Sequence, residues 1–515
     1  MIQQLSATSQ WDICIIGGGA TGLGIAVDAA SRGLKTVLLE KYDFAKGTSS
    51  RSTKLVHGGV RYLQQGNIKL VMEALKERGM LLKNAPHLAK NQSFIVPNYK
   101  WWEGSYYGLG LKVYDWMSGS LGLGASQILS REETMALAPT LDPEGLRGGV
   151  LYHDGQFDDA RLAIHLAMTA ADHGAVVLNY APVQNLLKEN GKVCGVNCLD
   201  TINSKQFEVK AKVVINATGI FTDAILHMDD PGADSIISPS QGVHIVLDRE
   251  FLPSSNAIMI PKTDDNRVLF AVPWHKKIIV GTTDTPVREV REEPVALEEE
   301  VAFILHHIQK YLTKDPGYED IKSVFAGLRP LVKGGSKTTA ALSRDHLITV
   351  SASELITITG GKWTTYRKMA EDVMEIAVHK AGLWATECKT KDLPIHGFQK
   401  NTDFEAPLYY YGSDQVHIHT LMNNDKDLNN VIHPGLPYIK AEITWAVRHE
   451  MCLTVEDALS RRTRALLLDA KAAIAAAPLV AKLMAQELHK DASWIAEQLD
   501  AFNKTAQNYL PITQH

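Results

Sequence analysis

The chain has 515 residues, of which 45% are hydrophobic and 22% are charged, and its formal net charge is −5. Domains usually contain about 100–200 residues, so this length predicts two or three domains with ample cores. The slightly acidic balance excludes a general nucleic-acid binder, which needs a basic surface. The opening MIQQLSATSQ lacks the basic and apolar regions of a secretory signal. No apolar run reaches the length of about 18 residues that predicts a membrane-spanning helix.

The stretch Trp11–Glu40 is the most informative part of the chain. It reads as a buried strand, a glycine turn, a helix and a second strand that ends in an acid. In the G-x-G-x-x-G positions, Gly17 permits a tight turn, Gly19 lets the backbone approach a pyrophosphate, and Gly22 lets the helix pack on the strand. Glu40 lies at the spacing, about 20 residues, of an acid that binds a ribose hydroxyl. We therefore predict a dinucleotide-binding unit whose helix N-terminus binds phosphates.

The next segments are more varied. A polar loop rich in Ser and Thr covers Tyr42–Lys54, and an amphipathic helix is predicted over Ile68–Asn84. Residues 98–126 alternate aromatic residues and glycines with few charges. Two explanations for this segment stay open. Its aromatic residues suit either an ordered segment packed against the rest of the protein or a surface patch at the level of lipid headgroups.

The central region predicts two sheets. A helix is expected over Asp158–His173, followed by a strand near Ala175–Asn179 and a short buried strand over Lys212–Gly219. We expect this last strand to complete the nucleotide-binding sheet, so the first domain is discontinuous. The alternating patterns within residues 237–290 predict antiparallel strands of a second domain.

The last third of the chain becomes helical. A buried strand at 355–361 precedes a helix at about 363–380, and Lys391–Tyr438 reads as an irregular linker. From Ala441 onward the pattern is helical, which predicts a separate C-terminal domain.

Several polar residues in this region have ordinary interpretations. Thr454 and Asp457 predict a capping arrangement at a helix start. Three basic residues are interpreted as charges on helix surfaces: Arg461, Arg462 and Arg464. The cysteines lack zinc-ligand spacing and are interpreted as reduced, mostly buried thiols, so no metal site is expected: Cys14, Cys194, Cys198, Cys388 and Cys452.

Longer motifs, in order along nearly the whole chain, carry a family resemblance. They are KGTSSRSTKLVHGGVRYLQQG, SQGVHIVLD, VGTTDTP, FAGLRPLV, LSRDH, TITGGKWTTYRKMAED and AVRHEMCLTVEDALSRRTR. With the N-terminal unit they closely resemble the FAD-dependent glycerol-3-phosphate dehydrogenases of the respiratory, aerobic type. The resemblance implies an α/β plus α fold: a discontinuous FAD-binding Rossmann domain of the glutathione-reductase type, an antiparallel-sheet substrate domain and a C-terminal helical domain.

We place the domain boundaries accordingly. The expected FAD-binding domain comprises residues 1–90, 150–235 and 340–385. The expected substrate-binding domain comprises residues 91–149 and 236–339, and the helical domain comprises residues 386–515.

The resemblance also implies a reaction. It is oxidation of sn-glycerol 3-phosphate to dihydroxyacetone phosphate, with hydride transfer from C2 to FAD and electrons passed to a quinone. Glycerol 3-phosphate and a quinone are the expected partners, nucleic acid is not one, and a homodimer is left open. The expected location is cytoplasmic, and peripheral contact with the inner face of the cytoplasmic membrane is left open.

Four residues at family motif positions are the catalytic candidates. His57 is the favoured base, since an imidazole titrates near working pH, and His244 is the second choice. Arg329 is left open as a residue that steers the proton. Lys362, after a glycine turn near the flavin, is expected to stabilise negative charge.

The substrate phosphate and the cofactor need further residues. Arginine suits bidentate phosphate recognition, so the substrate-binding candidates are Arg61, Tyr62, Arg329 and Arg344. The expected FAD contacts are Gly17, Gly19, Gly22, Glu40, Lys41, Thr48, Ser49, Ser50, Ala217, Gly219, Gly360, Gly361, Lys362, Thr364 and Thr365.

Three competing functions stay open. The first is an α-glycerophosphate oxidase that passes electrons to oxygen. Those oxidases tend to carry an extra insertion, and this chain is too short to contain it. The second is a related FAD amine or amino-acid oxidase, which would need fewer cations than the cluster of Arg61, Arg329 and Arg344 provides. The third is a non-catalytic flavin-binding sensor, which would not need the set from His57 to Lys362.

Overall fold

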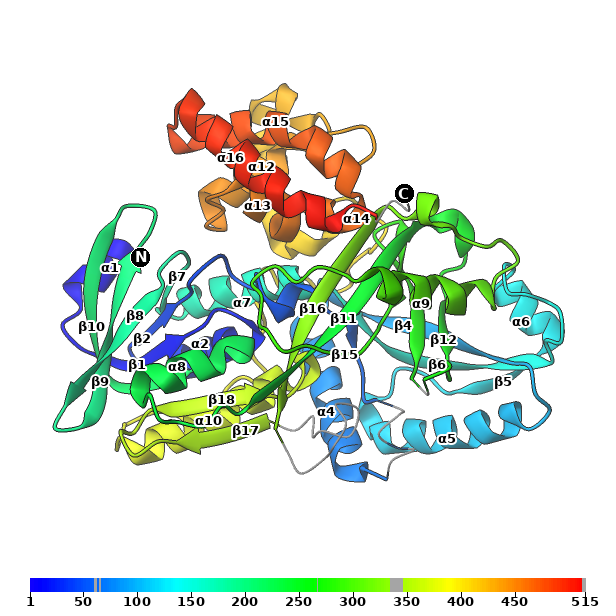
Figure 1. The fold of residues 1–515 in the computed structure, drawn as a ribbon, viewed down its shortest axis with the longest axis horizontal. Helices are drawn as coiled ribbons and strands as arrows, with labels where there is room; N and C mark the ends of the chain where they lie inside the picture. Colours follow the sequence, from blue (N-terminus) through cyan, green and yellow to red (C-terminus); the bar gives the residue numbers. More distant parts are fainter. Residues whose placement is uncertain (60–62, 64–65, 266, 334–345, 512–515) are drawn as a thin grey trace.

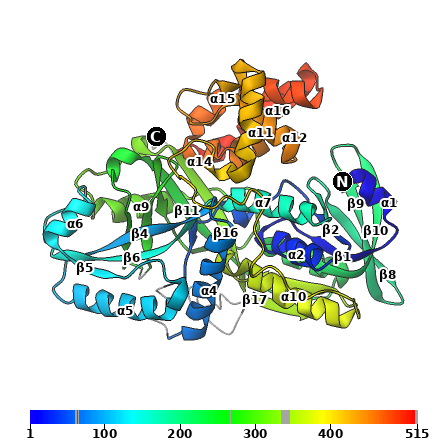
Figure 2. The same cartoon turned by 180° about the vertical axis from the view of Figure 1, so that it is seen from behind.

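The computed structural model describes residues 1–59, 63, 66–265, 267–333 and 346–511. Figure 1 shows two lobes, each built on a sheet, lying side by side, with a helical body above them. The same arrangement seen from behind places α7 and α2 beneath this helical body (Figure 2). Within the described ranges, no helix is both long and apolar enough to cross a membrane.

The first sheet contains the predicted dinucleotide-binding unit. Its strands lie in the order β17 (His346–Val350), β18 (Ile356–Gly360), β10 (Lys205–Asn216), β1 (Trp11–Ile16), β2 (Thr36–Leu39) and β7 (Val176–Leu178). β1 pairs in parallel with β2 and with the end of β10, which confirms that the strand predicted at Lys212–Gly219 completes this sheet. Such strands are buried on both faces and therefore consist of continuous apolar runs.

Helices and a hairpin surround this sheet. The packed helices are α2 (Ala20–Ser31), α7 (Asp159–Asp172) and α10 (Tyr366–Lys380), while α1 (Ile2–Ala7) and α8 (Thr222–Asp229) flank it. The antiparallel strands β8 (Val183–Glu189) and β9 (Lys192–Asp200) extend the start of β10. The Asp158 carboxylate accepts a hydrogen bond from the Arg161 amide and caps α7, close to the predicted helix start.

The second sheet is mainly antiparallel, as the alternating patterns predicted. Its main path is β15 (Thr285–Pro286), β11 (Ile237–Asp248), β14 (Lys277–Gly281), β13 (Leu269–Trp274), β12 (Ala257–Ile260), β4 (Ala89–Asn98), β6 (Gly148–Phe157) and β3 (Leu55–Val56). β16 (Ser323–Val332) pairs with β11, and β5 (Gln127–Ser130) pairs with β6. β3 and β6 therefore belong to this sheet, because β6 pairs with β4 along its whole length and β3 pairs with β6; β3 and all but the first two residues of β6 fall within segments expected in the FAD-binding domain.

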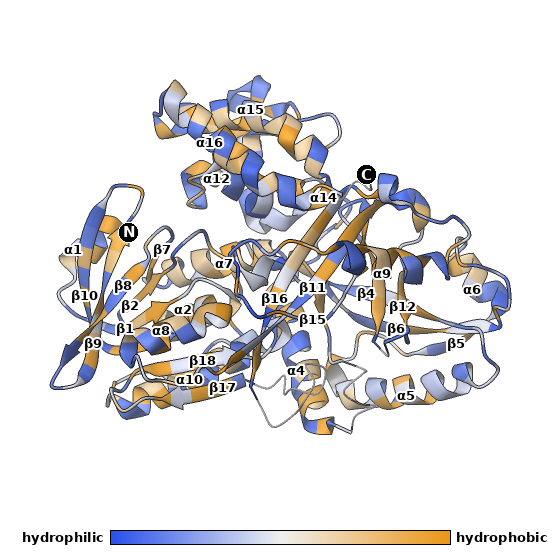
Figure 3. Ribbon diagram, viewed as in Figure 1, coloured by the Kyte–Doolittle hydropathy of each residue, from blue (hydrophilic) through white to orange (hydrophobic). Residues whose placement is uncertain are grey.

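Helices cover this second lobe: α4 (Ile68–Asn84), α5 (Glu103–Ser118), α6 (Arg131–Leu137) and α9 (Glu298–Gln309). α4 has the bounds predicted from its amphipathic pattern. α5 lies within the aromatic segment 98–126 and packs on the body through a narrow face that includes Leu111 and Tyr114. Figure 3 shows hydrophobic colouring on parts of α5, which runs along the lower edge of the molecule.

The C-terminal body comprises α11 (Gln415–Asn424), α12 (Lys440–His449), α13 (Val455–Asp457), the π-helical turn Ala458–Arg462, α14 (Ala465–Leu468), α15 (Ala470–Leu488) and α16 (Ala492–Ala506). The prediction of an irregular linker over Lys391–Tyr438 is wrong for Gln415–Asn424, because these residues form the helix α11. The predicted cap is confirmed, since Thr454 and Asp457 form a reciprocal capping box. The surface placement of three arginines is wrong, because all are buried: Arg461, Arg462 and Arg464.

Candidate active site

A cavity of about 550 Å³ opens at the carboxyl ends of β1, β10 and β18. Ligands of open α/β sheets bind at this edge, where the strand order reverses. Most of the predicted cofactor residues line the cavity: Gly17, Gly19, Glu40, Lys41, Thr48, Ser49, Ala217, Gly219, Gly360, Gly361, Lys362 and Thr364. Three predicted residues lie outside its lining: Gly22, Ser50 and Thr365.

The glycine turn needs its glycines for a steric reason. Gly17 has φ +110°, and a Cβ there would lie 2.7 Å from the carbonyl oxygen of Ala217. A Cβ on Gly22 would lie 1.9 Å from the Gly17 carbonyl oxygen. Gly22 therefore serves close packing of α2, while Gly19 begins that helix and leaves its backbone open to the cavity.

Glu40, the predicted ribose-binding acid, is held by backbone amides at the edge of the cavity. Its carboxylate accepts hydrogen bonds from the amides of Gly18, at 2.6 Å, and Tyr42, at 2.8 Å. Burial raises the pKa of Glu40 to about 7, with Asp43 contributing and the Gly18 amide opposing the shift. Lys41, in contrast, is exposed and pairs with Glu292.

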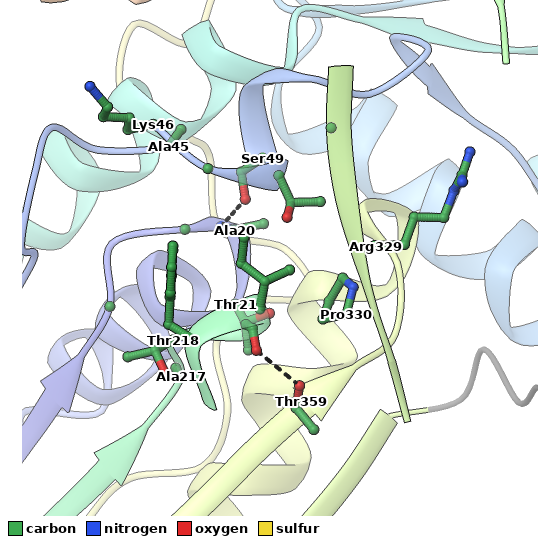
Figure 4. A pocket seen from close by; sticks show the side chains of 18 of the residues that line it. Ala20, Thr21, Ala45, Lys46, Ser49, Ala217, Thr218, Arg329, Pro330 and Thr359 are labelled. Atoms are coloured by element: carbon green, nitrogen blue, oxygen red, sulfur yellow. Dashed lines mark hydrogen bonds between the residues drawn. The ribbon is translucent and has the colours of Figure 1, made fainter. Parts of the chain in front are cut away.

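The short helix η1 (Thr48–Ser50) joins three parts of the cavity wall. The Ser49 hydroxyl accepts a hydrogen bond from the Ala20 amide at the start of α2, 2.9 Å away (Figure 4). The Ser49 carbonyl accepts from Trp363 Nε1 at 2.8 Å, and the Thr48 hydroxyl donates to the Leu328 carbonyl at 2.6 Å. Segments distant in sequence therefore meet at this turn.

A second cavity of about 190 Å³ adjoins the first. Thr53, Leu55, His57 and Arg329 line both cavities. Its other walls are largely apolar and aromatic, including Phe94, Tyr152, Met259 and Phe270. In Figure 4 the Arg329 side chain points away from Ala20 and Ser49, on the far side of β16.

Arg329 is fixed by oxygen atoms on several sides. Its guanidinium forms an ion pair with Asp284, at 3.2 Å, and donates to the Thr283 carbonyl at 2.9 Å and the Thr282 hydroxyl at 3.2 Å. A Cβ on Gly242 would lie 2.4 Å from Arg329 Nη2, so this glycine makes room for the side chain. Such preorganisation suits recognition of an anion, although Asp284 offsets part of the charge.

The two histidine candidates differ in environment. His57 is half-buried where the cavities join, and its amide donates to the Thr364 hydroxyl at 3.2 Å. His244 is buried, stacks on Phe325 with ring centroids 4.8 Å apart, and contacts the Thr53 hydroxyl at 2.9 Å through Nε2. Burial, with the charges of Lys54 and Arg329, lowers the pKa of His244 well below its ordinary value.

Some predicted residues cannot be placed, and others were missed. Arg61, Tyr62 and Arg344 lie outside the described residues. Thr53 and Arg267 line the second cavity without having been predicted. Thr53 belongs to the Ser- and Thr-rich loop, which could have signalled it, whereas Arg267 lies between strands where no local pattern marks a site.

The first cavity fits FAD. It combines a glycine turn at a helix N-terminus, the buried acid Glu40 after the second strand, and polar groups of the Thr48–Ser49 turn. The first two features suit the pyrophosphate and the ribose of a dinucleotide. Lys362 lies in the same cavity, after Gly360 and Gly361, whose positive φ values of +80° and +73° form a tight turn.

Comparison with known proteins agrees with this reading. Residues 12–367 match the family model described as "FAD dependent oxidoreductase", and residues 352–494 match that of the C-terminal domain of alpha-glycerophosphate oxidase. The mitochondrial glycerol-3-phosphate dehydrogenase of Homo sapiens is 42% identical, over 97% of this chain and 74% of its own length. That of Schizosaccharomyces pombe is 39% identical, over 99% of this chain and 88% of its own length.

Solved structures extend the comparison. The glycerol-3-phosphate dehydrogenase of Bacillus halodurans, complexed with FAD, matches with a TM-score of 0.81 and 28% identity, covering 100% of this chain and 98% of its own. The L-alpha-glycerophosphate oxidase of Mycoplasma pneumoniae shares the fold, with a TM-score of 0.55 and 18% identity over 74% of this chain and 97% of its own. The chain therefore belongs to the FAD-dependent oxidoreductases, among the FAD-dependent glycerol-3-phosphate dehydrogenases.

Proposed function

We propose that the enzyme oxidises sn-glycerol 3-phosphate to dihydroxyacetone phosphate and passes the electrons to a quinone. Bound FAD supplies the hydride acceptor. The observation that carries the proposal is the junction of the two cavities, which both Arg329 and His57 line. A substrate at this junction can place its reacting carbon toward the cofactor cavity and the rest of the molecule in the second cavity.

Each residue at the junction has a distinct task in this proposal. Arg329 binds phosphate oxygens, because its guanidinium is already oriented by Asp284 and neighbouring carbonyls. His57 accepts the proton of the C2 hydroxyl, for which it must lie within hydrogen-bond reach of that oxygen. Lys362 stabilises negative charge that develops during the reaction.

Anaerobic mixing of the FAD-loaded enzyme with glycerol 3-phosphate, and separately with glycerol, tests the proposal. We expect rapid loss of the flavin absorbance with the phosphate ester and little loss with glycerol, because only the ester offers charge to Arg329. Reoxidation is then followed with a water-soluble quinone and with oxygen. Equal bleaching by both donors would contradict phosphate recognition, and faster reoxidation by oxygen would contradict the quinone.

A quinone acceptor would bring the enzyme to a lipid surface, and α5 offers a suitable face. An outward stripe runs along α5 from the residue just before it and consists of Trp102, Tyr106, Leu109, Val113 and Trp116, spaced four and three residues apart in turn and all exposed. Aromatic residues with this placement bind at the level of lipid headgroups. Exposed lysines flank the stripe, at Lys100 and Lys112, and favour anionic lipid.

The inner face of α5 contacts residues at and beside the second cavity. The Tyr114 hydroxyl accepts a hydrogen bond from the Gly58 amide at 2.8 Å and donates to Asp154 at 2.7 Å. Gly58 follows His57 in the chain, and Asp154 lines the second cavity. This contact between α5 and the wall of the second cavity supports electron delivery at a membrane surface.

Replacing Trp102 and Trp116 together with serine is expected to weaken binding to vesicles of anionic phospholipid by at least about tenfold. Each exposed indole would lose burial in the interface, and burial of a large apolar side chain contributes about 1.5–3 kcal/mol. Co-sedimentation measures the effect. The matched control is Trp384→Ser, a tryptophan that is 97% exposed elsewhere on the chain. Equal loss in the control and the double variant would exclude α5 as the lipid-binding face.

A further inference from the structure

The C-terminal body reaches the cofactor loop through arginines that are buried rather than exposed. Arg461 and Arg462 both bind the carboxylate of Asp43, which lies shortly after Glu40, at 2.5 and 2.6 Å. Arg464 is only 1% exposed and lies at the start of α14. The C-terminal body therefore contacts the outer side of the loop that forms one wall of the cofactor cavity.

Arg464 binds this loop directly. Its Nη2 donates to the Ser50 carbonyl at 3.0 Å and to Asp159 Oδ1 at 2.8 Å. The backbone of Arg464 has φ +66°, a left-handed conformation that side chains other than glycine seldom adopt. The chain thus holds an arginine at a position whose backbone favours glycine, and its guanidinium spans two elements of another domain.

Asp159, which binds Arg464, also binds two further residues of the loop. Its second oxygen, Oδ2, accepts hydrogen bonds from Lys54 Nζ and from the Ser52 hydroxyl, each at 2.7 Å. Lys54 Nζ also donates to the Ser50 carbonyl at 2.7 Å. The backbone from Ser50 to Lys54 is therefore fixed from outside by one buried carboxylate and two buried cations.

The inner side of the same segment carries the cavity contacts. Ser49 binds the start of α2 and the Trp363 indole, and Thr48 binds β16 next to Arg329. Thr53 lines both cavities and contacts His244. A shift of the Ser50 carbonyl would therefore disturb the phosphate-binding turn and the junction of the cavities together.

We propose that Arg464 is a positioning residue for the cofactor site: the C-terminal domain uses it to hold the Thr48–Lys54 loop in the shape that binds FAD. The inference deepens the proposed function and depends on that function only through the binding of FAD. Arg464 itself lines neither cavity, so its effect on the cofactor is exerted through the loop. The inference assigns the C-terminal domain a role in the reductive half-reaction.

Other contacts keep the C-terminal body in place when Arg464 is changed. The Ser323 hydroxyl donates to the Leu466 carbonyl at 2.9 Å, and the Ala470 amide donates to the Lys322 carbonyl at 3.0 Å. Asp159 also keeps Lys54 as a partner, so loss of the guanidinium does not leave this carboxylate without a counter-charge. The effect of a substitution at Arg464 can therefore be attributed to a change in the loop and not to loss of contact between the C-terminal body and the rest of the protein.

The test compares Arg464→Gln and Arg464→Lys with Arg448→Gln in the full chain. Arg448 is a partly exposed arginine of the same body that pairs with Glu487. We expect Arg464→Gln to bind FAD about tenfold more weakly, since a hydrogen bond to a charged group contributes about that factor. We also expect an altered flavin absorbance band and slower flavin reduction, with partial recovery in Arg464→Lys and no change in Arg448→Gln.

The outcomes separate a positioning role from a purely structural one. Unchanged FAD affinity and flavin absorbance in a folded Arg464→Gln protein would overturn the inference, whatever its melting temperature. If Arg464→Gln does not fold, Arg464→Lys decides the matter, and wild-type FAD affinity and absorbance in it would also overturn the inference. Failure of the wild-type flavin to be reduced by glycerol 3-phosphate would contradict the proposed function and leave the FAD-binding comparison intact.

Discussion

Replacing Arg329 with alanine is expected to lower the efficiency of flavin reduction by glycerol 3-phosphate by about 100- to 1,000-fold while FAD stays bound. The guanidinium is held by Asp284 and neighbouring oxygen atoms at the junction of the cavities, so it needs little rearrangement to bind phosphate. Loss of such a preorganised donor usually has an effect of about this size. The measurement is the anaerobic reduction rate as a function of substrate concentration, with FAD content determined by absorbance.

Two controls accompany this variant. Arg329→Lys keeps the charge but loses bidentate geometry, so we expect an intermediate rate. Because alanine removes the ion pair of the buried Asp284, the melting temperature is measured as well; the Ser240 hydroxyl still donates a hydrogen bond to that carboxylate. An Arg329→Ala enzyme that is reduced at the wild-type rate would show that the phosphate binds elsewhere.

Replacing His57 with asparagine is expected to slow flavin reduction by about 100- to 10,000-fold at saturating substrate, the usual range for loss of a general base. The wild-type rate should rise with pH as the base loses its proton, and the variant should lose that rise. His57 is favoured because it lines both cavities and is only half-buried. The measurement is the limiting reduction rate at saturating substrate as a function of pH.

His244→Asn is the matched comparison. Burial and the charges of Lys54 and Arg329 lower the pKa of His244 well below its ordinary value, so His244 is a weaker base and titrates at lower pH than an ordinary histidine. We therefore expect His244→Asn to change the rate less than His57→Asn and to keep the pH dependence. The opposite result, in which His244→Asn loses the pH dependence and His57→Asn keeps it, would transfer the role of base to His244.

The cofactor site was the part most accessible from the sequence. Dinucleotide recognition at Trp11–Glu40 depends on local geometry, since the turn at Gly17, the start of α2 and the acid Glu40 lie within one βαβ unit. The crossing back of β10 beside β1 could also be anticipated, because a short apolar run ending in glycine fits a central parallel strand. Both inferences follow from periodicity and glycine stereochemistry alone.

The aromatic segment marks the limit of such reasoning. Its composition favoured a segment packed on the protein and left a lipid-facing patch open, because apolar periodicity does not tell which face of a helix finds a partner. The structure gives α5 two apolar faces, one packed through Leu111 and Tyr114 and one exposed with Trp102 and Trp116. Which of these faces is covered depends on the position of α4 and of the neighbouring strands.

Local patterns of residues were enough to predict the nucleotide-binding unit, the antiparallel character of the second lobe and the helical C-terminal body. Only the folded chain shows that Arg464 is buried against Ser50 and Asp159, far away in the chain, and that His57 and Arg329 share one junction. The difference lies in the range of the interactions. Turns, caps and strand periodicity depend on neighbours within a few residues, whereas burial of a charge depends on a counter-charge supplied by another domain.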